Sequence, residues 1–318
     1  MRIGIYLNTF GMDLDTLLSR LRAAAEAGLS SAFLAQLTSL DAINVAALGA
    51  REVPGIEVGT AVVPTYPRHP LALAVQAMTA QAISGNRFTL GVGTSHRQII
   101  EGSYGLSFDR PARHTREYLS VLVPLLRGEA VEYHGETLSV SGQVEVPGTT
   151  PPPVLLSALG PAMLRIAGEL ADGTVTTWTG AAAIAGHIAP RITEAARAAG
   201  RPAPRIVASA LVAVTDDPER VRDQVAERLG FAAGFASYRS LLELQGLSGL
   251  HETVIAGDEG MVDKEIGRFA EAGTTDFLVS PAGDEDDQAR TLAFVRDRLA
   301  TAPWALSTAQ KGSQGGYR

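Results

Sequence analysis

Short apolar segments alternate with amphipathic segments along most of the chain. The apolar segments are rich in Val, Ile, Leu and Ala at successive positions, which is typical of parallel strands that are buried on both faces. The amphipathic segments repeat their apolar residues every three or four positions, as helices with one buried face do. We predict eight strands, at residues 3–8, 32–37, 58–63, 88–92, 154–159, 173–178, 206–214 and 276–279.

Helices are predicted between these strands. One helix is predicted to begin at Pro70, because proline fits the first turn of a helix, and to end at Gly85-Asn86. Helical spacing predicts that the buried face of this helix carries Leu71, Val75, Met78 and Ala82. The other predicted helices cover residues 13–27, 42–50, 111–127, 161–171, 181–199, 218–244, 258–272 and 284–299, and residues 101–111 are predicted to be irregular.

Eight alternations of strand and helix predict an α/β fold, the (β/α)8 TIM barrel. An open doubly wound sheet is the alternative. A short β-excursion is expected at residues 131–140, between strands four and five, and extra helices are expected before strand eight. We predict one domain over residues 1–302, followed by a polar, Gly-rich tail at 303–318 that is expected to be flexible.

Composition narrows the classes of function. The 318 residues include no cysteine, which excludes disulfides and thiolate chemistry. The formal net charge is −7 with no basic tract, so nucleic acid is not an expected partner. No apolar run is long enough to span a membrane, and the N-terminus enters a strand without room for a signal peptide. A cytoplasmic protein is therefore expected.

Residues that follow the strands of a barrel meet at one rim and form the site. Here they are mostly neutral hydrogen-bonding groups and aromatics, without an acidic metal set or a Ser-His-Asp set. The only lysines, Lys264 and Lys311, lie away from strand ends. Such a site usually depends on an organic cofactor for its chemistry, and we predict no metal. The predicted substrate pocket consists of Asn8, Phe10, Gln36, Tyr66, Tyr104 and Trp178.

Two loops are suited to phosphate. Thr94, Ser95, His96 and Arg97 follow a strand and a glycine, and they combine hydroxyls with potential cations. Residues 157–161 place Pro161 at the start of a helix, so that backbone N–H groups face the rim. A tight turn without a binding role is the alternative for each loop.

Several phrases together resemble the luciferase-like flavin monooxygenase superfamily. They are GTAVVPTYPRHPLALAVQAMT, GNRFTLGVGTSH, REYL and PPPVLLSALGPAMLRIAGELADGTVTTW. The resemblance is greatest to the branch of oxidoreductases that use the deazaflavin coenzyme F420. It implies a TIM barrel, a cofactor ring at the carboxyl ends of the strands, and a homodimer.

The resemblance also implies roles for individual residues. A cis peptide that faces the ring corresponds to Ala61–Val62, after Thr60. The cofactor's ribityl chain and phosphate correspond to Thr94, Ser95, His96 and Arg97, and to Ser157, Ala158, Leu159, Gly160 and Pro161.

One departure from this branch affects the expected reaction. Its sugar-phosphate dehydrogenases carry an Asp-His pair where this chain has Gln36-Leu37, and their substrate-binding lysines are absent. We therefore expect hydride transfer between the deazaflavin C5 and a small organic substrate, more in the direction of reduction. Gln36 would position the substrate, and His96, titrating near neutrality, would supply the proton. An FMN-dependent monooxygenase and a non-catalytic flavin-binding protein are the alternatives.

Overall fold

The structure is a computed structural model that describes residues 1–36 and 38–301. Leu37, the predicted end of the second strand, and the predicted flexible tail at 303–318 lie outside the described residues.

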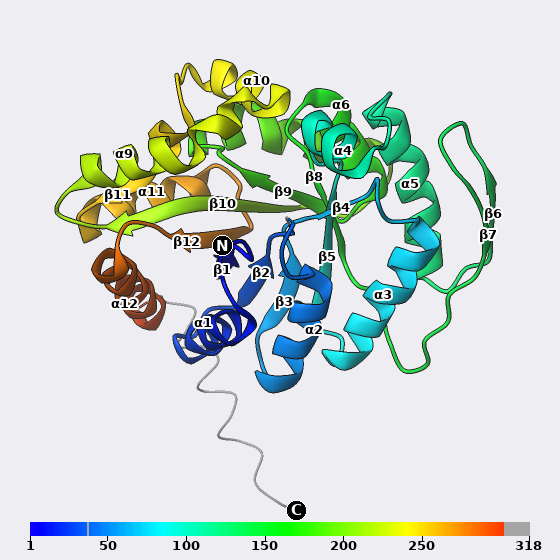
Figure 1. The fold of residues 1–318 in the computed structure, drawn as a ribbon, viewed down its shortest axis with the longest axis horizontal. Helices are drawn as coiled ribbons and strands as arrows, with labels where there is room; N and C mark the ends of the chain where they lie inside the picture. The colour runs from blue at the N-terminus through cyan, green and yellow to red at the C-terminus, as the bar shows by residue number, and fades with distance from the viewer. Residues whose placement is uncertain (37, 302–318) are drawn as a thin grey trace, which may run out of the picture.

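Eight parallel strands of the described chain form a closed ring (Figure 1). Each strand pairs with the next, and the last pairs with the first. This closure confirms the predicted TIM barrel and excludes the open sheet. In order around the ring the strands are β1 (Arg2–Leu7), β2 (Ser31–Leu34), β3 (Glu57–Thr60), β5 (Phe88–Gly93), β8 (Val154–Ser157), β9 (Gly173–Thr177), β10 (Arg205–Val214) and β12 (Asp276–Pro281).

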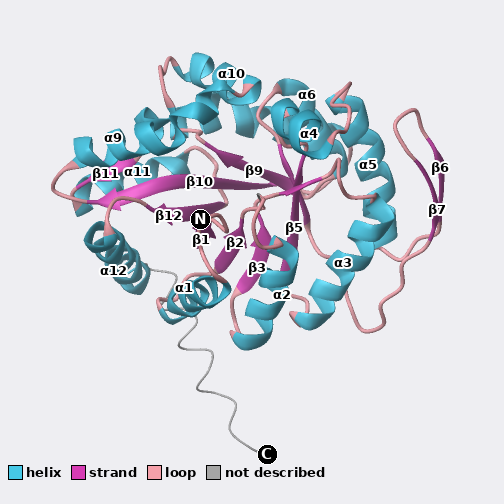
Figure 2. Cartoon of the chain, in the orientation of Figure 1, coloured by secondary structure: helices cyan, strands magenta, loops and turns pink. Residues whose placement is uncertain are grey.

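The helices lie outside the strands, as Figure 2 shows. A large apolar cluster fills the space between the two layers. The helices that follow the strands are α1 (Leu14–Glu26), α2 (Ala42–Glu52), α3 (Pro70–Ile83), α4 (Arg97–Tyr104), α5 (Pro111–Leu126), α6 (Pro161–Leu170), α7 (Ala181–Ala183), η1 (Ile184–Ile188), α8 (Ala189–Ala198), α11 (Glu259–Glu271) and α12 (Glu285–Thr301). No helix of the described chain is long and apolar enough to cross a membrane.

Two additions to the barrel were predicted and are confirmed. The β-excursion is an antiparallel hairpin of β6 (Val131–His134) and β7 (Ser139–Gly142), which lies beyond the helices at the right of Figure 1. Its turn is held by the carboxylate of Glu117, which accepts from the Thr137 N–H at 2.8 Å. The segment before the last strand contains α9 (Pro218–Leu229), η2 (Gly230–Gly234), α10 (Ala236–Gln245), η3 (Leu250–Thr253) and the short strand β11 (Ile255–Gly257).

The barrel interior is itself packed. Buried side chains from five different strands meet there, namely Phe33, Leu155, Val175, Val207 and Leu278, with Tyr6, Ala61 and Val62 against them. At one end of the barrel, Arg205 binds the carboxylates of Glu57 and Asp276, both at 2.9 Å. This end is closed by ion pairs, so a ligand must enter from the other end.

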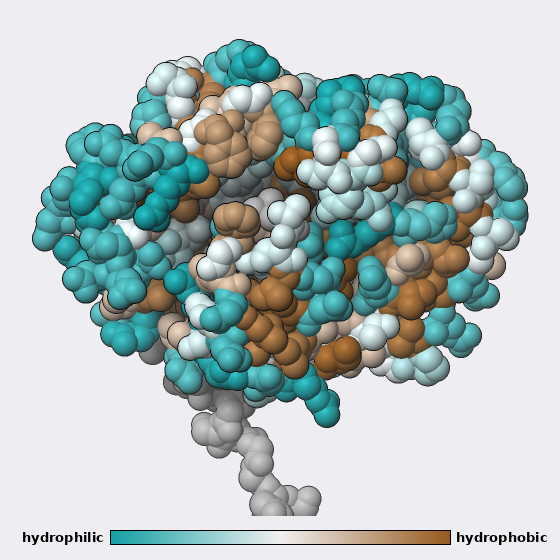
Figure 3. Space-filling view, viewed as in Figure 1, coloured by the Kyte–Doolittle hydropathy of each residue, from teal (hydrophilic) through white to brown (hydrophobic). Residues whose placement is uncertain are grey.

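The buried face of α3 differs from the prediction. Met78 is buried, but Val75 is 49% exposed, and the core face is formed instead by Leu73, Ala74 and Ala77. The helix carries no charged residue in 14 positions, so apolar spacing does not determine which face is inward. Hydrophobic surface gathers over α2 and α3 in Figure 3, where Leu48 and Ile83 are also exposed.

A second correction concerns the segment after β5. Residues 97–104 form the helix α4, although residues from 101 onward were predicted to be irregular. Arg97 and Glu101 form an ion pair one turn apart, Ile100 is buried, and Gly105 ends the helix at φ +65°. The helix is short and buries a single residue, so its sequence shows no clear repeat of apolar residues at helical spacing.

Candidate functional site

Two adjoining cavities lie at the carboxyl ends of the strands, each with a volume of about 440 Å³. The first cavity lies between β3, β5 and β8, and the second lies between β1, β9, β10 and the segment around α10. The surface in Figure 3 is hollowed in the middle of the same view. Residues that line both cavities are Tyr6, Gln36, Pro64, Ser95, His96, Ile99, Thr177, Ser209 and Tyr238.

Two helix N-termini line the first cavity. The residues before the helices are His96 for α4 and Gly160 for α6, and neither makes a side-chain capping hydrogen bond. The first N–H groups of a helix lack backbone partners and attract anions. A Cβ built on Gly160 would meet nothing within 4 Å, so open space lies in front of this turn. The arrangement suits a phosphate.

The wall of the first cavity between β3 and β5 is formed by a break in the strand pairing. Ala61 and Val62 line the cavity there, and the bond between them is cis, as predicted. Thr60, just before the break, is fully buried; its hydroxyl donates to Gly91 O at 2.8 Å and accepts from Gly91 N at 2.9 Å. The Thr60 side chain thus replaces a backbone partner where the ladder is interrupted.

A glycine is required beside this break. A Cβ built on Gly93 would lie 2.8 Å from Val62 and 3.2 Å from Ser157. Two non-glycine residues of the rim, Ser95 and Trp178, adopt positive φ angles of 60° and 58°. Such conformations are uncommon and gather at functional sites.

The second cavity is lined mainly by aromatic and aliphatic side chains. Phe10 and Phe231 are 62% and 71% exposed although both are large and apolar. Trp178, Phe235 and Tyr238 stand against one another deeper in the cavity. Small hydroxyl groups, such as Ser209 within β10 and Ser280 near the end of β12, provide the polar part of the lining.

His96 stands between the two cavities. Its ring stacks on Phe235 with centroids 4.0 Å apart, and Nδ1 lies 3.5 Å from the Ser237 hydroxyl. Burial lowers the pKa of His96 to about 4. The imidazole is therefore neutral at pH 7, which corrects our expectation that it titrates near neutrality.

Gln36 lines both cavities and also supports the fold. Its Oε1 accepts from the Ala42 N–H at 2.8 Å, at the start of α2. The side chain is thus oriented by the helix that follows its strand.

Arg97 lines the first cavity but is already paired. Its guanidinium binds Glu101, lies 5.4 Å from the centre of the Phe108 ring and is 3.9 Å from Asp109. An anion in the first cavity would share this cation with two carboxylates.

Comparison with known proteins identifies the family. A family model described as luciferase-like monooxygenase matches residues 1–302. The chain belongs to this family.

Relatives within the luciferase-like family include proteins named for F420. A Mycobacterium tuberculosis protein named as a coenzyme F420-dependent oxidoreductase is 31% identical over 188 residues, which cover 54% of each chain. A 5,10-methylenetetrahydromethanopterin reductase of Archaeoglobus fulgidus is 33% identical over 122 residues, covering 38% of this chain and 36% of the reductase. The chain thus spans about half, or less, of the length of these relatives.

Solved structures support the fold. An F420-dependent secondary alcohol dehydrogenase, in complex with an F420-acetone adduct, superposes with a TM-score of 0.79 over 96% of this chain and 98% of that chain. The two sequences are 17% identical, so the likeness concerns the fold.

The structure brings most of the predicted cofactor residues of this luciferase-like protein together. Nine of them line the first cavity: Ala61, Val62, Thr94, Ser95, His96, Arg97, Ser157, Leu159 and Gly160. Three do not: Thr60 and Ala158 are fully buried, and Pro161 is the first residue of α6, after Gly160.

The predicted substrate residues divide in the same way. Asn8, Phe10, Gln36, Tyr104 and Trp178 line the second cavity. Tyr66 lines neither cavity and stacks on His114 with centroids 3.9 Å apart. His114 in turn lies 3.0 Å from the Thr65 hydroxyl, so this group belongs to the packing behind the rim.

Among the lining residues that the sequence analysis missed are Tyr6, Ser209 and Tyr238. Tyr6 and Ser209 lie within β1 and β10, whereas the residues were sought at the ends of the strands and in the loops that follow them. Each is a polar residue inside an apolar strand, a signal that could have placed both at the barrel axis. Among the described residues, no group of three His, Cys, Asp or Glu side chains could hold a metal ion.

Proposed function

We propose that this luciferase-like protein is a coenzyme F420-dependent oxidoreductase that transfers a hydride to a small organic substrate. The observation that carries the proposal is the pair of adjoining cavities, one with two uncapped helix N-termini and one with aromatic walls. The names of the mycobacterial and archaeal relatives support F420 as the cofactor.

The residues of the first cavity fit this group. The open turn at Gly160 and the N-terminus of α4 offer N–H groups for a phosphate. Ala61 and Val62 offer an apolar wall for a flat ring, and Gly93 leaves no side chain beside it. When bound, the deazaflavin supplies a hydride at one ring carbon.

The chain's own residues then orient the substrate and supply a proton. Burial raises the pKa of Tyr238 to about 12 and raises that of Tyr6 further. Both phenols are protonated at pH 7, and both lie at the boundary of the two cavities. A hydrogen bond from Tyr6 Oη or Tyr238 Oη to a substrate oxygen would favour its reduction, which is why we propose the reductase direction.

The test is a binding titration with purified protein. F420 and FMN are added separately, and binding is followed by the change in cofactor fluorescence. We expect F420 to bind at least tenfold more tightly than FMN. Tighter binding of FMN would instead support a monooxygenase, and binding of F420 without turnover of any reducible substrate would support a non-catalytic flavin-binding protein.

A variant pair tests where the cofactor phosphate binds. Gly160→Asp adds a negative charge at the start of α6, where a Cβ has room. Gly186→Asp adds the same charge at an exposed glycine of η1, also with room for a Cβ. We expect F420 affinity to fall at least tenfold, about 1.4 kcal/mol, in Gly160→Asp only. Equal affinity of the two variants would place the phosphate elsewhere.

A further inference from the structure

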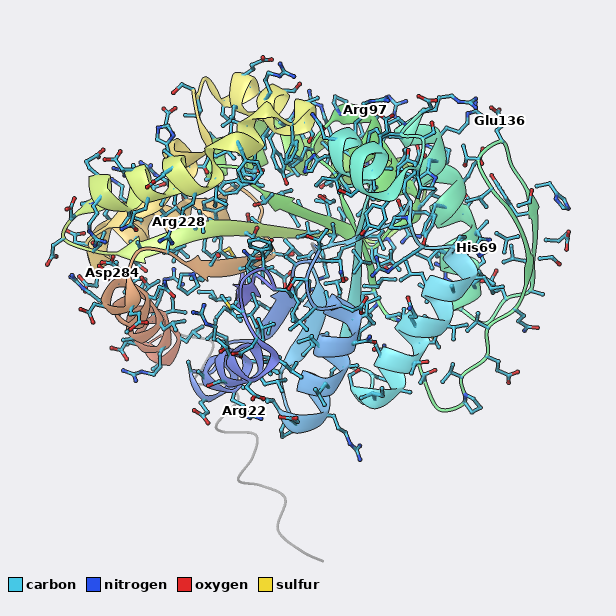
Figure 4. All side chains as sticks on the ribbon, in the orientation of Figure 1. Arg22, His69, Arg97, Glu136, Arg228 and Asp284 are labelled. Atoms are coloured by element: carbon cyan, nitrogen blue, oxygen red, sulfur yellow. The ribbon has the colours of Figure 1, made fainter. Side chains whose placement is uncertain are left out.

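The second cavity has a chemical character that the proposed function does not specify. Among the described residues that line it, none is Asp, Glu, Lys or Arg. The charged residues labelled in Figure 4, such as Arg22, Arg228 and Asp284, lie on outer helices and loops. Ten large aromatic or aliphatic side chains line the cavity, without a fixed charge beside them in the lining: Tyr6, Phe10, Ile99, Tyr104, Trp178, Leu211, Leu229, Phe231, Phe235 and Tyr238.

His96 is the remaining group of this lining that could carry a positive charge. It is stacked on Phe235, and Tyr238 meets it edge-on with centroids 4.8 Å apart. Burial among these side chains removes the ring from water, which disfavours the charged imidazolium and lowers the pKa of His96 to about 4. At pH 7 the cavity therefore offers no cation to an anionic ligand.

The exposure of the aromatic side chains points to an apolar ligand. Phe231, Phe10 and Tyr104 are 71%, 62% and 39% exposed and all line the second cavity. Large apolar groups that remain open to water inside a concave site are usually covered by what binds there. The small hydroxyl groups of the lining can orient one or two polar atoms of such a ligand.

We propose that the second cavity binds an uncharged organic molecule with a large apolar or aromatic part, and that anionic substrates are excluded. An acid that entered would lose its hydration without gaining a cation or an ion pair. That the ligand is a substrate rests on the proposed function, whereas the binding preference is a property of the cavity itself.

Two probes with the same aromatic framework test this preference. N-phenyl-1-naphthylamine is uncharged, and 8-anilinonaphthalene-1-sulfonate adds one sulfonate; both fluoresce in apolar sites. Titration into the purified protein at pH 7 should give at least tenfold tighter binding of the uncharged probe, about 1.4 kcal/mol. Equal or tighter binding of the sulfonate would overturn the proposal.

Variants show whether the probe occupies this cavity. Leu211→Arg places a cation in the lining, and Phe231→Arg does so at a position that is 71% exposed. Each should reduce the preference for the uncharged probe at least tenfold or reverse it. The matched control is Leu244→Arg, at a 52% exposed position of α10 outside the lining, which should leave the preference unchanged.

Two outcomes separate this inference from the proposed function. If the uncharged probe is preferred and F420 does not bind, the cavity inference stands and the F420 function is wrong. If F420 binds but neither arginine variant in the lining alters the preference, the probe occupies another surface and the inference is wrong. Val75→Glu tests one such surface, because Val75 lies in the exposed apolar face of α3. Weaker binding of the uncharged probe to this variant would show that the probe binds there.

Discussion

The hydroxyl of Thr60 is predicted to stabilise the barrel at the break between β3 and β5. Leu90 donates its N–H to Pro153 O on the β8 side, so the next peptide groups, those of Gly91, face β3. There the Thr60 hydroxyl takes the place of a backbone partner: it donates to Gly91 O at 2.8 Å and accepts from Gly91 N at 2.9 Å. Thr60→Val keeps the shape of the side chain and removes both hydrogen bonds.

The magnitude follows from the two groups left without a partner. A buried N–H or C=O that loses its hydrogen bond costs about 1 to 3 kcal/mol, and the added methyl group recovers a fraction of this. We therefore expect the free energy of unfolding to fall by about 2 to 4 kcal/mol, measured by urea unfolding monitored with circular dichroism.

Thr150→Val is the control, since Thr150 is exposed and bonds to Asn86 Oδ1 through its backbone N–H, which the substitution keeps. The control should change the free energy of unfolding by less than about 0.5 kcal/mol. An equally small change in Thr60→Val would refute the reasoning, because it would show that Gly91 finds another partner or that water reaches it.

Three further predictions concern titration and assembly. Burial lowers the pKa of His114 to about 4, so below about pH 6.5 the unfolded state binds a proton that the folded state does not. Stability should then fall between about pH 6.5 and 4, and less steeply in His114→Gln, as measured by urea unfolding at several pH values. His96→Asn should leave the pH profile of kcat/KM unchanged between about pH 6 and 8, because the imidazole is already neutral there; loss of a titration in that range would contradict this. We expect a homodimer through the apolar outer face of α3, so Val75→Glu should halve the mass measured by light scattering, whereas Leu244→Glu should leave it unchanged; a monomeric wild type or a dimeric Val75→Glu would contradict this assignment.

The barrel could be predicted because its strands are short, apolar on both faces and separated by helices. The same composition hides finer detail. In α3 the apolar residues surround the helix, so the sequence could not distinguish the face with Leu73 from the face with Val75. Burial against the strands decided between them.

The candidate site was predicted at the strand ends and in the loops after them, and it was missed further inside strands such as β1 and β10. Ser95 and Gly160 follow strands and were found by that rule. Tyr6 lies one residue before the end of β1 and points to the barrel interior, where it packs with a cluster from several strands. The neutrality of His96 could not be read from the sequence either, because Phe235 and Tyr238 approach it from a segment about 140 residues away.

The ring of strands also sets the order in which the molecule can form. β1 has β2 on one side and β12 on the other, and Arg2 bonds to Asp276 across 274 residues of sequence. At typical rates of synthesis, residue 276 emerges roughly 14 to 55 s after residue 2. During that time β1 carries an edge of unpaired backbone groups, which can pair with other chains. Protection of this edge during translation should therefore govern the yield of folded protein, and slower growth at low temperature should raise that yield by reducing the number of nascent chains that meet.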